Sequence, residues 1–198
     1  MATYASIKYD MDLASSATGA GALTLLATGT ASGDSTLSFT SNIDSTYDEY
    51  VFKFYDLNPA TDDKKFQFNL SADGGSNYNV TKTTTFFSAY HDESDTATNL
   101  GYRTGNDLAQ GTGVQFFTDS AGNGSDESAA GELHLFAPSS TTFVKHFYSR
   151  TSTYYTSNYA FDVFVAGYAN TTSAVNAVQF SVESGGNFDG VIKMYGVS

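Results

Sequence analysis

The sequence of 198 residues contains no cysteine, no tryptophan and only 2 prolines. Without cysteine the chain can form neither a disulfide framework nor a thiolate nucleophile nor a cysteine-based zinc site. No apolar run approaches the roughly 18 residues that a membrane-spanning helix needs. The first residues also lack the basic and apolar regions of a signal peptide, so we expect no secretion by that route.

Positive charge is scarce as well. The chain has 9 Lys and Arg residues against 21 Asp and Glu residues, which gives a formal net charge of −12 at pH 7. A nucleic-acid-binding surface needs clustered cations that displace counterions, and an anionic membrane attracts the same kind of surface. The charge balance therefore argues against nucleic acid and against a membrane as partners.

Aromatic residues and turn-forming residues are plentiful. The sequence contains 16 Phe and 14 Tyr, and each ring can bury roughly 150–250 Å². Rings can therefore supply the core that the few aliphatic side chains do not. The 18 Gly residues, together with Asn, Asp and Ser, provide turns. This composition is typical of an all-β protein.

Apolar residues recur at every second position in several short segments. Phe66, Phe68 and Leu70 alternate with polar neighbours, which is the pattern of a half-buried strand. Related patterns occur in residues 50–57, 131–137, 161–168, 177–183 and 190–196. No segment predicts an amphipathic helix longer than two turns. The sequence predicts about nine to twelve strands in one antiparallel β-sandwich, jelly-roll-like, over residues 23–198.

Two regions lack this regular alternation. Residues 1–22 contain many small side chains, and they form either an extended attachment arm or a frayed terminus. Residues 88–131 combine two short possible strands with long polar loops. Such loops carry recognition in many folds or are solvated filler, and both interpretations stay open.

The residues that could carry chemistry form no recognised catalytic motif. His91, His134 and His146 show none of the spacings of a zinc or iron site. The chain has no Gly-x-Ser-x-Gly elbow of a serine hydrolase and no phosphate-binding loop. A glycosidase needs two carboxylates, and the spacing of the sequence identifies no second one to act with Glu132. The sequence therefore predicts a protein that is not an enzyme and has no cofactor.

Two acidic loops raise the question of calcium, whose ligands are carboxylate and carbonyl oxygens. They lie in residues 92–95 and 119–127. In the second loop Ala121 occupies a ligand position, and the terminal Glu of a calcium loop is missing. We therefore expect solvated acids in both loops and no bound metal.

One tyrosine-rich stretch is a candidate recognition surface. Aromatic faces can stack on the apolar face of a sugar ring, while amide and carboxylate groups bind its hydroxyls. The candidate residues are Tyr154, Tyr155, Asn158 and Tyr159. The alternative is that these tyrosines pack at a strand edge or form a contact between subunits.

The last residues place a glycine turn before a short strand that ends in Lys-x-Tyr-Gly. Residues 187–190 and 192–196, Asn-Phe-Asp-Gly and Ile-Lys-Met-Tyr-Gly, resemble the closing phrase F-D-S-G-T-I-K-L-Y-G of many tailed-bacteriophage virion structural proteins. The serine of that phrase is missing before Gly190. Residues 37–40, 47–50 and 71–78 fit the same class of proteins.

This resemblance implies a non-enzymatic virion protein on the particle surface, either a head decoration or a tail- or fibre-type subunit. Such a subunit would assemble through an exposed strand edge and the arm of residues 1–22. Its partners would be other capsid or tail proteins, further copies of itself and, where it meets a host, a surface glycan. Ile192 and Met194 are expected in the core, with Tyr195 and Gly196 sealing the edge. A free-standing carbohydrate-binding module and a hydrolase remain as alternatives.

Overall fold

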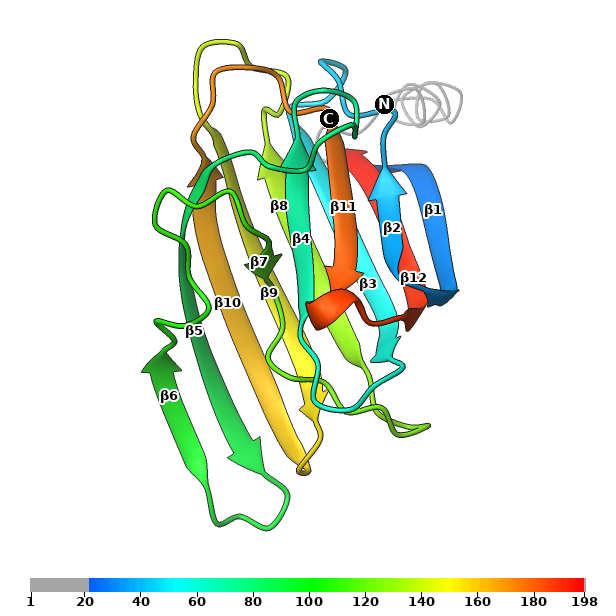
Figure 1. Cartoon of the computed structure of the whole chain (residues 1–198), viewed down its shortest axis with the longest axis vertical. Helices are drawn as coiled ribbons and strands as arrows, with labels where there is room; N and C mark the ends of the chain where they lie inside the picture. Colours follow the sequence, from blue (N-terminus) through cyan, green and yellow to red (C-terminus); the bar gives the residue numbers. More distant parts are fainter. Residues whose placement is uncertain (1–21, 198) are drawn as a thin grey trace, which may run out of the picture.

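The computed structural model describes residues 22–197, which fold into two antiparallel sheets packed face to face (Figure 1). The predicted all-β sandwich is therefore confirmed. The described residues contain no α-helix, and nothing among them has the length and apolar character of a membrane-crossing helix. The predicted arm of residues 1–22 lies, except for its last residue, outside the described residues.

The two sheets differ in size. The large sheet has eight strands in the order β1 (Leu23–Asp34), β12 (Phe188–Val197), β3 (Glu49–Pro59), β8 (Ala129–Phe136), β9 (Lys145–Tyr155), β10 (Tyr159–Ala169), β5 (Lys82–Asp92) and β6 (Thr98–Tyr102). The small sheet has four strands in the order β2 (Thr36–Phe39), β11 (Ala177–Val182), β4 (Phe66–Ser71) and β7 (Gln115–Phe116). A short 3-10 turn, Glu183–Gly185, connects β11 to β12.

Eight of the strands pass back and forth between the sheets along the chain, except that β4 and β7 both belong to the small sheet. The order β1-β12-β3-β8 faces the order β2-β11-β4-β7, which is the arrangement of a jelly roll. The other four strands are two additions, β5 and β6 between β4 and β7, and β9 and β10 between β8 and β11. They continue the large sheet past the small one (Figure 1). We call these four strands the extension and the other eight the jelly-roll part.

Phenylalanine rings fill the space between the sheets of the jelly-roll part. Phe180 of β11 lies at their centre and is fully buried, with its ring centroid 5.4 Å from those of Phe52 and Phe54 and 6.0 Å from that of Phe117. Phe68 of β4 belongs to the same group and is also fully buried, 6.5 Å from Phe180 and 5.3 Å from Phe147. The alternation in the sequence therefore identified true core positions.

The C-terminal strand contributes to this core without being an edge strand. Ile192 and Met194 are fully buried, as expected. The expectation that Tyr195 and Gly196 seal an edge is wrong, because β12 lies between β1 and β3. Gly196 has another role. A Cβ atom there would overlap the ring of Tyr47, so the lack of a side chain at this position leaves room for that ring.

The inner face of the extension is more polar and is covered by residues 103–120. Thr151 of β9 donates from Oγ1 to the carbonyl of Phe117 at 2.5 Å. Thr84 of β5 donates from Oγ1 to Gln115 Oε1 at 2.6 Å. All these groups are buried, so hydrogen bonds replace part of the apolar packing that the jelly-roll part uses.

Two fully buried lysines lie at one end of the extension. Lys82 of β5 and Lys145 of β9 both pair with Ala169 of β10, so they lie in one row across the strands. The ammonium group of Lys82 donates to the carbonyl of Val80 at 2.8 Å, and that of Lys145 donates to the carbonyl of Phe143 at 2.8 Å. Burial lowers the pKa of Lys82 to about 8 and also lowers the pKa of Lys145.

Candidate functional site

The predicted recognition residues lie at the turn of the β9–β10 hairpin, and they divide between the two faces of the large sheet. Tyr155 pairs with Tyr159, and both pack against the core on the inner side. Tyr154 pairs with Ala160 and therefore points to the outer side, because successive strand residues face opposite ways. The four candidate residues do not share one surface.

Tyr154 and Asn158 belong to the structure of the turn. The hydroxyl of Tyr154 can donate to Glu93 Oε1 at 3.1 Å or to Asn158 Oδ1 at 3.2 Å. Burial and the hydrogen bond to Glu93 raise the pKa of Tyr154. Asn158 has a φ of 62°, a conformation that asparagine tolerates better than most residues. Its place in the sequence is thus explained by the turn.

On the inner side, Tyr155 and Tyr159 join Tyr90 of β5 around the buried ring of Phe161. The Phe161 centroid lies 5.1 Å from those of both Tyr90 and Tyr155. Tyr159 stands nearly perpendicular to the other two tyrosines, with interplanar angles of 77° to Tyr90 and 87° to Tyr155. The four rings therefore form one continuous aromatic wall drawn from three strand segments.

This wall lines a pocket of about 440 Å³, which we call the tyrosine pocket. Residues from the segment 103–120 and from the hairpin turn complete the lining: Arg103, Asn106, Asp119 and Ser157. Sequence reasoning missed Tyr90 and Arg103 and considered Asp119 only as part of the acidic loop 119–127, because the three residues come from separate stretches of chain. No local pattern links them to Tyr155 and Tyr159.

Several polar groups of the tyrosine pocket have unused hydrogen-bonding capacity. Across residues 22–197, the hydroxyls of Tyr90, Tyr155 and Tyr159 form no hydrogen bond. Arg103 donates from Nε to Ser88 Oγ at 3.0 Å, and its guanidinium carbon lies 5.9 Å from the Tyr90 ring centroid. Within the described part of the chain, the terminal amino groups of Arg103 form no hydrogen bond and can serve another acceptor. Burial, together with nearby carboxylates such as that of Asp119, raises the pKa of Tyr155.

No sheet formed by residues 22–197 packs on the outer side of the large sheet, which we call the open face. The open face carries the large exposed apolar side chains of the strands: Leu23, Leu25, Tyr55, Phe87, Leu100, Tyr102 and Tyr148. Phe87 and Phe164 stack there with centroids 4.9 Å apart and rings within 5° of parallel. Arg150 lies 4.9 Å above Phe164 and forms two hydrogen bonds, of 3.1 and 2.8 Å, with Asp162.

The open face is also hollowed. A shallow groove of about 840 Å³ crosses β3, β8, β9, β10 and β5. Small side chains form its floor: Ala89, Ala130, Ser152 and Ala160. Charges beside the groove are paired across strands, since Lys53 Nζ lies 3.8 Å from Glu132 Oε2.

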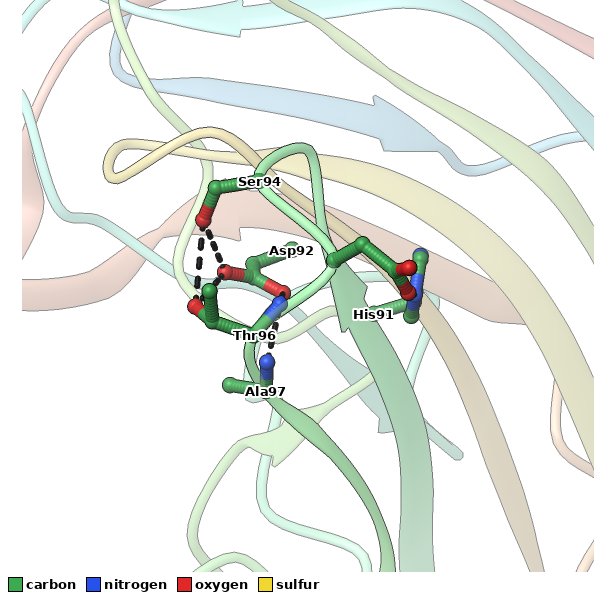
Figure 2. Close-up of polar contacts among 6 residues, drawn as sticks. His91, Asp92, Ser94, Thr96 and Ala97 are labelled. Carbon is green, nitrogen blue, oxygen red and sulfur yellow. Dashed lines mark hydrogen bonds and ion pairs between the residues drawn. The ribbon is translucent and has the colours of Figure 1, made fainter.

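The first acidic loop uses its central carboxylate to hold the turn between β5 and β6, as Figure 2 shows. Asp92 accepts hydrogen bonds from the hydroxyls of Ser94 and Thr96, both at 2.5 Å, and from the backbone amides of Thr96 at 2.9 Å and Ala97 at 2.7 Å. These bonds hold the pKa of Asp92 well below its usual range. The carboxylate thus has a complete set of partners within its own turn.

The second acidic loop is held in a similar way. Glu127 Oε2 accepts a hydrogen bond from the amide of Gly124 at 2.7 Å. Asn58 of β3 donates to the carbonyls of both Gly124 and Glu127, at 3.1 and 2.7 Å. In the described part of the chain, no three His, Asp or Glu side chains are grouped to hold a metal ion.

The three histidines lie apart from one another. His91 Nε2 is 3.0 Å from Asp95 Oδ1 at the β5–β6 turn. His134 lies on the open face, where Nδ1 contacts Glu49 Oε1 and the ring stacks on Tyr148 at 4.4 Å. Its Nε2 is 3.2 Å from Glu132 Oε1 without forming a hydrogen bond.

No protein-family model matches the chain, and neither does any curated protein. The stretches that resemble virion proteins do, however, lie together in the fold. Tyr50 pairs with Gly196 on neighbouring strands, and Tyr47 lies over the same glycine. A Cβ atom at Gly75 would lie 2.9 Å from Thr40 Cγ2, so the turn in residues 71–78 adjoins the end of β2. These residues therefore form part of the scaffold, and none of them lines the tyrosine pocket.

Proposed function

We propose that the protein is a non-enzymatic structural subunit on the surface of a bacteriophage virion, where it associates with further copies of itself through the open face. The virion assignment is supported by the resemblance of the C-terminal strand and of three earlier stretches. Association is supported by a single observation, the collection of large exposed apolar side chains on one sheet face. Contiguous apolar surface of this kind marks interaction sites in soluble proteins.

The charges on the open face favour a second copy of the chain as the occupant. The protein as a whole carries a net charge of −12, which makes copies repel one another. On the central part of the open face, both signs are interspersed: Lys53, Arg150 and Lys193 accompany Glu49, Glu132 and Asp162. A two-fold interface places the same patch against itself, so mixed charges can pair across it.

The test uses two exposed apolar residues that differ in position. Leu100 of β6 is 69% exposed on the open face, and Phe143 is 72% exposed in the β8–β9 connection. Leu100→Asp places a charge in the proposed interface, whereas Phe143→Asp is the matched control away from it. We expect Leu100→Asp to lower both self-association, measured by analytical ultracentrifugation, and incorporation into particles, measured by co-sedimentation. Phe143→Asp is expected to leave both unchanged.

Three outcomes would contradict parts of this proposal. Absence of the wild-type protein from purified particles would remove the virion assignment. A wild-type protein that stays monomeric would remove the second copy as occupant. Equal incorporation of Leu100→Asp and wild type would show that the open face is not the assembly surface.

The tyrosine pocket also favours a second candidate function, the binding of a host carbohydrate, which is compatible with the first.

A further inference from the structure

The tyrosine pocket lies where the extension continues past the small sheet. Its wall comes from β5, β9 and β10, and its rim comes from the segment that covers them. Tyr90, Tyr155 and Tyr159 are only partly buried, whereas Phe161 beneath them is almost completely buried. The rings thus have one side fixed by packing and another that reaches the pocket. A wall fixed in this way is preorganised, which lowers the entropy cost of binding.

The wall and the rim demand different properties of a ligand. Aromatic rings present apolar surface, whereas three tyrosine hydroxyls, the amino groups of Arg103 and the free oxygen of Asp119 present donors and acceptors. Asp119 uses Oδ1 to accept the amide of Ser120 at 2.9 Å, which leaves Oδ2. A pyranose meets both demands, because it has an apolar face of C–H groups and a rim of hydroxyls that both donate and accept.

The charges around the pocket argue for a neutral sugar. Arg103 is the one cationic side chain in the described lining, and Asp119 opposes it. Asp62 and Asp63 also lie close enough to Tyr155 to raise the pKa of its hydroxyl. An anionic ligand would approach these carboxylates inside a protein whose net charge is −12.

We propose that the tyrosine pocket binds a neutral pyranose, presented as a terminal sugar of a glycan. The rings of Tyr90, Tyr155 and Tyr159 contact its apolar face, and Asp119 and Arg103 bind its hydroxyls. The pocket volume of about 440 Å³ falls in the range of roughly 300–1,000 Å³ for small-molecule sites. The inference does not rest on the virion assignment, since it is tested on the isolated protein.

The hairpin itself supplies a matched control. Tyr154 and Tyr155 are neighbours, but only Tyr155 lines the tyrosine pocket. Binding is measured by NMR titration with the methyl glycosides of glucose, galactose, mannose and N-acetylglucosamine, and with that of N-acetylneuraminic acid as the charged comparator. We expect at least one neutral glycoside to bind with a Kd on the order of 1 mM. The shifted signals should include the tyrosine rings of the pocket.

Two conservative variants test the assignment without removing a ring. Tyr155→Phe and Asp119→Asn each weaken or remove one hydrogen bond to the sugar, so each should raise Kd by about threefold to tenfold. Tyr154→Phe should leave Kd unchanged. All three variants retain the aromatic packing, so their thermal midpoints should stay close to that of the wild type.

The inference would be overturned by any of three results. These are failure of every neutral glycoside to bind the wild type at about 10 mM, tighter binding of the charged comparator, or equal loss of binding in Tyr154→Phe and Tyr155→Phe. Particle incorporation is a separate measurement. A failure of sugar binding therefore leaves the proposed virion function standing, and a failure of incorporation leaves the sugar site standing.

Discussion

The jelly-roll part and the extension cover the inner face of the large sheet with different kinds of contact. In the jelly-roll part, Phe180 and its neighbours pack ring against ring between two sheets. In the extension, no second sheet of the described residues faces the large sheet over its full width, and buried side chains such as Thr84 and Thr151 form hydrogen bonds with the covering segment instead. Hydrogen bonds to the covering segment thus replace part of the apolar packing on this inner face, although the buried hydroxyls of Ser149 and Thr153 have no partner within the described residues.

This difference determines where a binding site is available. Rings between two sheets are closed on both sides and leave no space for a ligand. The rings of Tyr90, Tyr155 and Tyr159 lie beyond the reach of the small sheet, and a loop segment covers them incompletely. The region with the less apolar core is therefore the one that offers a pocket.

The largest effect is expected from truncating the ring at the centre of the jelly-roll part. Phe180→Ala should lower the free energy of unfolding by about 3–5 kcal/mol, because it removes buried apolar surface and leaves a cavity. Phe87→Ala is the control, since Phe87 is a ring of the extension on the open face, and its removal should cost less than about 1 kcal/mol. Chemical denaturation measures both values. Equal losses would mean that the open face is as tightly packed as the core.

The buried lysine of the extension should make stability depend on pH. The pKa of Lys82 is lowered from 10.5 to about 8 in the folded protein, so the unfolded chain holds this proton over a range where the folded protein has released it. Stability contributed by Lys82 therefore rises with pH, by about 2–3 kcal/mol between about pH 7 and about pH 10. The measurement is the difference in unfolding free energy between wild type and Lys82→Met at both pH values.

Other groups titrate in this pH range, and the comparison with Lys82→Met cancels their contributions. The wild type should gain stability relative to the variant as the pH rises. A constant difference across the range would contradict the lowered pKa of the buried ammonium group.

A smaller effect is expected from one hydrogen bond that fixes the covering segment. Thr151→Val keeps the shape of the side chain but removes the donor to the carbonyl of Phe117, which should cost about 1–2 kcal/mol. Ser152→Ala, next in the chain and on the open face, should change stability by less than about 0.5 kcal/mol. Thermal unfolding of both variants checks this, and equal midpoints would show that the segment is held by packing alone.

Much of the jelly-roll part could be predicted from the sequence. Its strands place Phe, Leu, Ile and Val on one side and polar residues on the other, as in the alternation of Phe66, Phe68 and Leu70. In the extension, β10 shows the same contrast in Phe161, Val163 and Val165, but β9 does not. The inward positions of β9 include Ser149, Thr151 and Thr153, which differ little in polarity from its outward positions. The alternation of apolar and polar residues therefore reveals which face of a strand is buried only where the buried face consists of apolar side chains.

The candidate site was predictable in part. Tyr155 and Tyr159 stand out by the density of aromatic residues, and both line the tyrosine pocket. The same density of aromatic residues also marks Tyr154 as a candidate, but the alternation of side chains along β9 places Tyr154 on the outer face of the sheet, away from the pocket. Tyr90 and Asp119 join the site through pairing of β5 with β10 and through the course of the covering segment. These are long-range features that no local pattern encodes.

The position of β11 and β12 has a consequence for the order of assembly of the chain. β11 lies between β2 and β4, and β12 lies between β1 and β3, although both follow all the other described strands in sequence. During synthesis, β1 and β2 therefore wait for partners that appear more than a hundred residues later, and β3 and β4 each wait equally long for one of their two partners. Closing such long loops slows folding and leaves strand edges unpaired meanwhile. Until β11 and β12 have been synthesised, the early strands of a nascent chain therefore present unpaired edges to other chains.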